Sequence, residues 1–444
     1  MQWATLFVLG AATALFHRLT AGAPLEARAT LALGFLLLAA PVAGSLVARR
    51  RWPRLVGYLA LGVIVGPSWF GLVRADEVAA LRFVGDVVVT LIAFRAGAGL
   101  DLRALALPQP GLRRALLGTV AGPFLLTALV AFVATPRFPL TVHESWGDGL
   151  AVALALGAFA VAASPVVVQA LLDETGARGP LARDVLAVAA GKEVAALVLL
   201  ALALLLAWPL SGAGAVVPAA LWQGPALLVG ALAAGAAAAW LLARVGVGAR
   251  TDTKILGLAL VAGLGAHWVG LEPVLFALAA GAVLRGLAPA QAAGLGGAVA
   301  GVEGPLFAVF FALAGAGLAL GALADVWGWV ALFAGLRALG LYYGMRWAAR
   351  SPSVDPALAQ YGWWGLVSQP GATVALAALA RRAFPEWGVS LEALVLAMIG
   401  VNEVAGAISF RRALDAVGDS KEDRHDAAQS VGDRDLVTLG GGGV

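Results

Sequence analysis

The sequence predicts an all-α polytopic membrane protein with 13–14 transmembrane helices, built as an inverted repeat with two broken crossing helices. Three observations lead to this prediction: the composition, the length of the apolar runs, and segments that recur in the two halves of the chain. Of the 444 residues, 61% are hydrophobic and 13% are charged, and the mean hydropathy is +0.90. Soluble domains are only about 45 to 50% apolar. Composition by itself therefore places most of the chain in a bilayer.

Fourteen apolar runs are long enough to cross a membrane, which takes about 20 residues, or fewer where charged ends reach toward water. No basic side chain precedes the first run, near residues 3–18, so we expect a retained helix instead of a cleaved signal peptide. The other runs lie near residues 30–48, 54–72, 80–99, 114–135, 148–171, 181–208, 217–243, 254–270, 272–287, 302–322, 325–348, 362–380 and 389–410.

Arginine and lysine side chains indicate the orientation of these spans. With the N-terminus inside, seventeen of them fall in the predicted inner loops and seven in the outer loops. The positive-inside rule then places both termini in the cytoplasm, and we expect the bacterial inner membrane as the location. Residues 413–444 are polar and end in a glycine run, which predicts a disordered cytoplasmic tail. The net charge of +4 thus belongs to loops, and no nucleic-acid partner is expected.

Several classes of function lack the residues they need. The chain has no cysteine, which excludes disulfides and thiolate sites. None of its four histidines has the spacing of a metal-ligand pair. The glycine runs lack the lysine and the strand of a phosphate-binding loop. We therefore expect no enzyme activity, no cofactor and no resident metal ion, with the lipid bilayer as the main partner.

Two pairs of segments recur at similar separations. Residues 96–105 (AGAGLDLRAL) match residues 314–323 (AGAGLALGAL), and residues 185–195 (VLAVAAGKEVA) resemble residues 395–405 (VLAMIGVNEVA). The separations, 218 and 210 residues, indicate two halves of similar layout. An odd number of spans per half would invert the second copy in the membrane. The alternative is that alanine-rich helices simply look alike.

Each half also has a span interrupted by proline. Pro165 lies within VAASPVVVQALL, and Pro370 and Gly371 lie within LVSQPGATVALA. Proline lacks a backbone N–H and clashes with the preceding turn, so a break within the membrane leaves backbone groups that need other partners. Inverted repeats with interrupted helices in matching positions point to a binding site near the middle of the bilayer. The alternative is that these prolines only kink their helices.

Two adjacent charges, Lys192 and Glu193, interrupt one apolar run. Each charge at the centre of a membrane helix costs about 2.5 to 3.5 kcal/mol on insertion scales. Neighbours on a helix point about 100° apart, so each needs its own partner. A buried carboxylate at Glu193 can hold either a proton or a cation, and competition between the two would give exchange. Alternatively, Glu193 is permanently paired with Arg337 or Lys192.

The order of motifs resembles the monovalent cation:proton antiporter superfamily, the sodium/proton and potassium/proton exchangers. The resemblance runs over roughly residues 30–412. GYLALGVIVGPSWFGL at 57–72 is similar to an early helix of the family, LIAFRAGAGLDLRAL at 91–105 to a second segment, and residues 153–188 to the broken helix and its link to the acidic helix. The resemblance implies a homodimer that exchanges Na⁺ or K⁺ for H⁺ by elevator-like alternating access.

The resemblance also implies how the chain is divided. A scaffold and dimerisation domain would comprise residues 29–110 and 217–322. A core ion-transport domain would comprise residues 111–208 and 324–412. Residues 1–28 would form an extra N-terminal helix.

In the family the binding carboxylate is an Asp preceded by Asn or Asp, and this position falls on Glu193, preceded here by Lys192. The helix crossing, with Ser164 and Gln369 beside Pro165 and Pro370, would adjoin the ion site. Lys192 would either donate to carbonyls exposed by the broken helices, which keeps transport, or act as a tethered cation in the field of Glu193, which would weaken it.

Three further charges are expected to compensate the site. Arg337 matches a basic family position and would neutralise Glu193 when no substrate is bound. Glu403, the counterpart of Glu193, either lines the site or braces the core. Arg95 either reaches the core from the scaffold or extends to the membrane surface. Two other functions stay open: a transport-inactive or sensory scaffold in which Lys192 replaces the ion, and an anion transporter of the same fold.

Overall fold

The computed structural model describes residues 22–50, 52–99, 109–207, 218–245, 273–318, 326–369 and 385–418, with residues 5, 9–11 and 13. Over these residues the chain is helical and contains no strand. The predictions for most of residues 3–18, for 254–270, for Pro370 and Gly371, and for the tail beyond residue 418 lie outside the described residues. The helices are α2 (Leu25–Ala48), α3 (Arg54–Val65), α4 (Ala75–Ala80), α5 (Arg82–Gly99), α7 (Pro110–Ala134), α8 (Trp146–Val161), α9 (Pro165–Thr175), α10 (Pro180–Ala207), α11 (Pro218–Val245), α13 (Pro273–Leu287), α14 (Pro289–Ala316), α16 (Trp327–Ala348), α17 (Pro356–Gly365) and α19 (Pro385–Val417).

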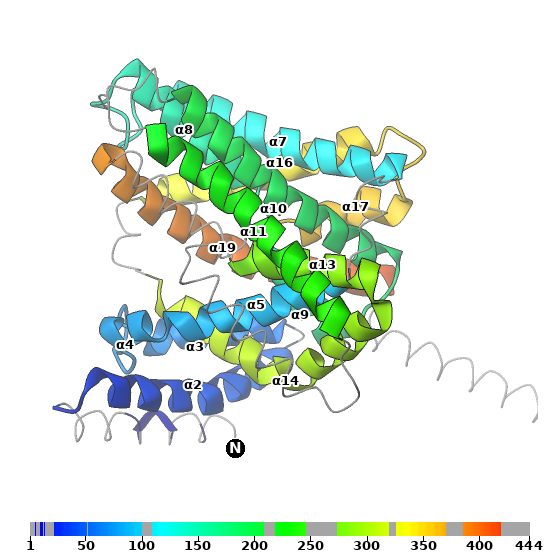
Figure 1. Ribbon diagram of the computed structural model, residues 1–444. Helices are drawn as coiled ribbons and strands as arrows, with labels where there is room; N and C mark the ends of the chain where they lie inside the picture. The colour runs from blue at the N-terminus through cyan, green and yellow to red at the C-terminus, as the bar shows by residue number, and fades with distance from the viewer. Residues whose placement is uncertain are drawn as a thin grey trace, which may run out of the picture.

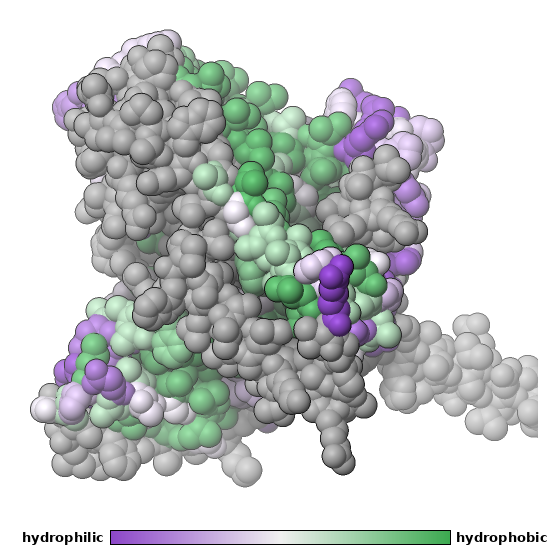
Figure 2. Space-filling model, in the orientation of Figure 1, coloured by the Kyte–Doolittle hydropathy of each residue, from purple (hydrophilic) through white to green (hydrophobic). Residues whose placement is uncertain are grey.

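The helices carry the surface expected of a membrane protein. In the described part of the chain, four are long and apolar enough to cross a bilayer, and a bent pair within α14 would add a fifth. On the face shown in Figure 2, the described residues near the middle of the molecule are mostly hydrophobic, and most of the hydrophilic ones lie toward its left and right sides. Large apolar side chains on α7 face outward, with Leu125, Leu129 and Val133 more than 60% exposed. Lipid is the solvent that suits such a surface.

The helices form two groups, and most of the contacts of each helix are with others of its own group (Figure 1). In the first group, α3 packs on α2 and α14, and α5 packs on α13 and α14. In the second, α7 packs on α8 and α16, α8 packs on α10, and α17 packs on α19. The groups touch where α5 meets α9 and where α3 meets α19.

Glycines make matching contacts in the two halves of the chain. A side chain at Gly62 of α3 would overlap the carbonyl oxygen of Ala312 in α14. A side chain at Gly281 of α13 would likewise overlap the carbonyl oxygen of Phe94 in α5. The two glycines, at positions 62 and 281, are 219 residues apart, and their partners, at positions 94 and 312, are 218 residues apart. The two contacts are therefore equivalent under the repeat, with the roles of the halves exchanged. Such close backbone approach is what small residues allow between membrane helices.

A second pair of contacts obeys the same rule. Gly97 of α5 lies against the carbonyl oxygen of Leu278, and Gly315 of α14 lies against that of Leu59. The separation of the two glycines is the 218-residue offset between the recurring AGAGL segments. The internal repeat predicted from the sequence is therefore confirmed by contacts between helices.

The helices α7 and α16 also cross through glycine. Side chains at Gly118 or Gly122 would overlap backbone atoms of α16, and side chains at Gly340 or Gly344 would overlap backbone atoms of α7. Each helix thus presents two glycines four residues apart, the small-residue pattern typical of close membrane crossings. This crossing brings the middle of α16 next to Pro123, which lies inside α7.

Some predicted boundaries were wrong. The predicted span 54–72 is helical only as far as Val65, because Gly66 adopts an extended conformation and a turn follows it. The last predicted span, 389–410, is longer in the structure and runs from Pro385 to Val417. Apolar periodicity does not detect either change, since turns and polar helix ends depend on local backbone geometry.

The α7–α16 crossing gives a first prediction. Replacing Gly340 with Ala forces its Cβ against the backbone of Pro123, so we expect a loss of about 1 to 3 kcal/mol from overpacking. Thermal unfolding of the purified protein in detergent measures this loss. Gly335→Ala on the same helix is the control, because nothing lies within 4 Å of its added Cβ. Both variants gain the same helix propensity, so equal melting temperatures would contradict the packing argument.

Candidate functional site

The first broken helix consists of α8 and α9. Helix α8 ends at Val161, and Ala162 already has an extended conformation (φ −52°, ψ 139°). Ser164 precedes a proline, which disfavours the helical conformation at that position. Its hydroxyl accepts the N–H of Val167 at 3.2 Å and so caps α9, while Pro165 occupies the first helical position, where no N–H is needed. The break predicted at Pro165 is confirmed.

The second break follows α17. This helix begins at Asp355, whose side chain accepts the N–H groups of Ala357 and Leu358, and it ends at Gly365. Residues 366–369 are not in a regular helix. The backbone N–H of Ser164 donates to the carbonyl of Ser368 at 3.1 Å. The two breaks therefore touch through their main chains.

Arg337 on α16 binds the exposed carbonyls of both breaks. Its side chain is completely buried. Its guanidinium donates to Ala162 in the first break and to Leu366, Val367 and Ser368 in the second. Carbonyls at helix ends inside a membrane have no water to bind and need such donors. These hydrogen bonds show Arg337 joining the two breaks, and its compensation of Glu193 stays a prediction.

Gln369 links the second break to α8 and α19. Its amide nitrogen donates to the carbonyl of Phe159 at 2.9 Å. That carbonyl is one of the last four of α8, which have no partner within the helix. The amide oxygen of Gln369 accepts from Asn402 on α19 at 2.8 Å. Both amides are buried, so this chain of hydrogen bonds fixes where the second break lies.

Lys192 on α10 reaches sideways to α7. Its side chain is fully buried, and its ammonium donates to the backbone carbonyl of Thr119. In a regular helix that carbonyl would accept from the N–H four residues later, but Pro123 has none. The first alternative for Lys192 was donation to carbonyls of the broken helices. The structure shows donation to a backbone carbonyl, but this carbonyl belongs to α7, and the effect of Lys192 on transport stays a prediction.

The two acidic candidates lie at equivalent positions of α10 and α19. Glu193 and Glu403 are both buried, 2% and 5% exposed. Helix α10 packs on α8, α9 and α17, so Glu193 lies on a helix that contacts both broken spans. Glu193 points about 100° away from Lys192 around the helix axis. The roles predicted for these carboxylates, and for Ser164 and Gln369 as ion ligands, stay predictions.

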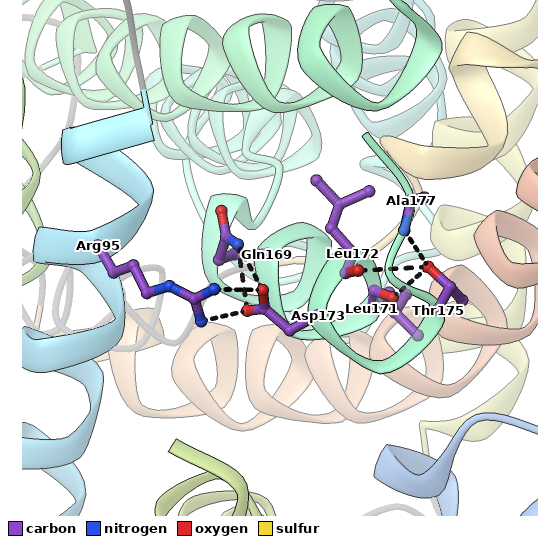
Figure 3. A network of polar contacts seen from close by, with 7 residues as sticks. All are labelled: Arg95, Gln169, Leu171, Leu172, Asp173, Thr175 and Ala177. Atoms are coloured by element: carbon purple, nitrogen blue, oxygen red, sulfur yellow. Dashed lines mark hydrogen bonds and ion pairs between the residues drawn. The ribbon is translucent and has the colours of Figure 1, made fainter. Parts of the chain in front are cut away.

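Arg95 extends from α5 to the end of α9, as Figure 3 shows. Its guanidinium makes two parallel hydrogen bonds to Asp173, at 2.6 and 2.7 Å. Gln169, one turn earlier on α9, donates to the same carboxylate at 3.1 Å. Of the two alternatives for Arg95, the structure shows contact with the second helix group. The residue it compensates is Asp173.

A cavity of about 720 Å³ opens between the two helix groups beside this ion pair. Its walls include Tyr58 and Arg95 from the first group and Asp173 and Leu186 from the second. Leu186 lies seven residues before Glu193 on α10, a distance of about 10 Å along the helix axis. The cavity thus ends within two helical turns of the buried carboxylate.

Sequence reasoning missed three residues of this region. Asp173 lies beyond the end of the predicted span 148–171, but α9 continues to Thr175. Asn402 aligns with Lys192 in the repeat, yet its pairing with Gln369 has no sequence signal. Thr119 could have been found from Pro123, because a proline inside a predicted span identifies the carbonyl four residues earlier as one that needs a donor.

Comparisons with known proteins agree with this geometry. The family model described as "Sodium/hydrogen exchanger, transmembrane" matches residues 34–410. The sodium proton antiporter MjNhaP1 from Methanocaldococcus jannaschii superposes with a TM-score of 0.63 at 15% identity, over 88% of this chain and 97% of that one. The iron transporter MagA from Paramagnetospirillum magneticum is 29% identical over 161 residues, 36% of this chain. The match spans about a third (33%) of that relative's length.

Arg337 gives the second prediction. Arg337→Met removes the donors of three buried carbonyls, since the fourth, that of Ser368, keeps the N–H of Ser164. Each orphaned acceptor costs about 1 to 3 kcal/mol. We expect little monodisperse protein in size-exclusion chromatography. Arg337→Lys should be intermediate, because an ammonium keeps the charge but lacks the planar fork. Arg346→Met, at an exposed position of the same helix, is the control. A wild-type yield of Arg337→Met would refute the role assigned to this side chain.

Proposed function

The chain belongs to the sodium/hydrogen exchanger family, and from this premise we propose that it exchanges a monovalent cation for protons across the membrane. Family and fold are those of transporters, and the apolar helices are those of an integral membrane protein. The observation that carries the proposal is the carboxylate of Glu193, buried on a helix that packs against both broken spans.

In this proposal Glu193 is the site shared by the cation and the proton. A carboxylate in a poorly hydrated place binds a proton or a metal cation but not both, because the second positive charge would be uncompensated. Ser164 and Gln369, at the two breaks, are the oxygen-bearing neighbours proposed to help coordinate the cation. Binding of one ion therefore requires release of the other, which is the condition for exchange.

The hydrogen bonds of the buried cations favour an active transporter over a silent one. Lys192 donates to the carbonyl of Thr119, and Arg337 donates to the carbonyls of the breaks. Both positive groups thus have oxygen acceptors on other helices. A transport-inactive protein with Lys192 in place of the ion, or an anion transporter, would use these charges in the site itself.

We further propose that the two helix groups are the scaffold and the core of an elevator. The scaffold would comprise residues 29–110 and 217–322, and the core residues 111–208 and 324–412. Arg54, Arg178 and Arg183 line the cavity and belong to loops predicted to be cytoplasmic. The cavity is then the inner access route, and the structure corresponds to an inward-facing state. A homodimer in the bacterial inner membrane with both termini inside completes the proposal.

We propose a monovalent cation, and not a transition metal, as the transported ion because of the side chains that are present. Transition metals in proteins are usually held by several His, Cys, Asp or Glu side chains. In the part of the chain that the structure describes, no group of three such residues converges. The name of the relative MagA concerns iron, so ferrous ion belongs in the transport assay as a competitor of Na⁺, K⁺ and Li⁺.

The third prediction concerns Glu193. In proteoliposomes with an internal pH dye, addition of Na⁺, K⁺ or Li⁺ should move protons, and Glu193→Gln should abolish this flux because an amide cannot exchange a proton for a cation. Glu26→Gln, at an exposed position of α2, should transport like the wild type. If the wild type shows no response to any of these cations between about pH 5 and 9, the proposed exchange is excluded. If Glu193→Gln is fully active, Glu193 is excluded as the site.

The fourth prediction concerns the ion pair between the proposed scaffold and core. Arg95→Gln removes both hydrogen bonds to Asp173 and should shift the population away from this conformation. The chain has no cysteine, so Ala170→Cys, in the cavity wall, reports access through its labelling rate with a membrane-impermeant maleimide. We expect slower labelling when Arg95→Gln is added.

Arg28→Gln is the matched control, because Arg28 pairs with Asp76 inside the first helix group. It should leave the labelling of Ala170→Cys unchanged. If Arg95→Gln also leaves the rate unchanged, the Arg95–Asp173 pair does not hold the conformation described here.

A further inference from the structure

Lys192 supplies a hydrogen-bond donor at the point where Pro123 removes one. Pro123 lies inside α7 and removes the backbone donor that Thr119 would otherwise use. The ammonium of Lys192, from α10, donates to that carbonyl. One helix therefore lacks a donor at the point where the other supplies one. Without this hydrogen bond, both the carbonyl of Thr119 and the ammonium of Lys192 would be buried in the membrane interior without a partner.

The surrounding packing keeps both partners in place. On one side, Gly340 of α16 lies against the backbone of Pro123. On the other, a Cβ at Gly191 would lie 3.0 Å from the side chain of Leu116, so the residue before Lys192 permits close approach of α10 to α7. The lysine stem spans a short gap, and its charge is held on α7.

The adjacent carboxylate makes this placement matter. Lysine is a flexible point charge with three donors, and an anion accepts more strongly than a neutral carbonyl. Lys192 and Glu193 leave the helix about 100° apart, but the lysine stem is long and flexible. An ammonium that is not held on α7 is therefore free to swing into the field of Glu193. There it would occupy the place that a transported cation needs.

We propose that the carbonyl exposed by Pro123 anchors Lys192 on α7 and thereby keeps this fixed cation from competing with the transported cation at Glu193. Lys192 is then a positioning residue that stabilises α7, and Pro123 is the residue that makes a lysine compatible with exchange. The anchoring part stands on the hydrogen bond alone. The competition part rests on the proposed function.

A double-mutant cycle on the full-length protein in detergent tests the anchor. Lys192→Met leaves the Thr119 carbonyl without a donor, and Pro123→Ala gives that carbonyl a backbone N–H, which competes with the ammonium for it. Each single variant should lower the melting temperature. The double variant restores the backbone hydrogen bond and removes the charge, so it should recover more than half of the larger loss. A double variant as unstable as the two losses combined would overturn the anchor.

Pro41→Ala provides the control cycle, because Pro41 is also inside a helix, α2, in the other helix group. Combined with Lys192→Met it should show additive changes of melting temperature. Recovery of the same size with Pro41→Ala would mean that removing any helix-interior proline stabilises the protein, and the specific pairing would be rejected.

Transport kinetics test the competition. In Pro123→Ala the KM for the cation should rise about three- to ten-fold, because a tethered ammonium competes with it, while the rate at saturating cation changes less. Adding Lys192→Met should bring KM back toward the wild-type value. An unchanged KM in Pro123→Ala beside a coupled stability cycle would overturn the competition and leave the anchor. Absence of transport in the wild type would defeat the proposed function, with the stability cycle still deciding the anchor.

Discussion

The arrangement of the two helix breaks depends on the hydrogen bonds that the guanidinium of Arg337 donates to their carbonyls. Two helices are broken in the core of the protein, and each break leaves buried backbone carbonyls that need donors from the protein. One side chain from α16 binds four of them and joins the two breaks. Arginine suits this role because it stays protonated and offers several donors in a fixed plane. The crossing of the broken helices would otherwise leave backbone groups unsatisfied.

The same rule explains the other buried polar side chains. Gln369 binds a terminal carbonyl of α8, and Lys192 binds the carbonyl that Pro123 deprives of its donor. Residues that look like an ion-binding cluster in the sequence thus include several that complete the backbone. Glu193 is the buried carboxylate on which the proposed exchange depends.

A good part of this arrangement could be predicted. The Ser164–Pro165 dipeptide indicates a helix start within an apolar run, and the structure has one there. The 218-residue repeat reappears as matched glycine contacts between α3, α5, α13 and α14. These features are local or periodic, so they leave a trace in the order of residues. The pairings of Arg337, Lys192 and Arg95 leave no such trace, because each joins two different elements of the fold. Pro123 identifies the Thr119 carbonyl as one that needs a donor, but the sequence does not say which side chain supplies it.

The sequence by itself determined that the chain is an all-helical membrane protein with a repeat, a helix break at Pro165 and a buried Lys–Glu pair. Hydrophobic length, proline chemistry and charge are properties of neighbouring residues, which is why they can be read in order. Only the tertiary structure decided that Lys192 donates a hydrogen bond to α7 and that Arg337 joins the two breaks. A hydrogen bond across helices depends on where α7, α10 and α16 cross, and glycine contacts far apart in the chain set those crossings.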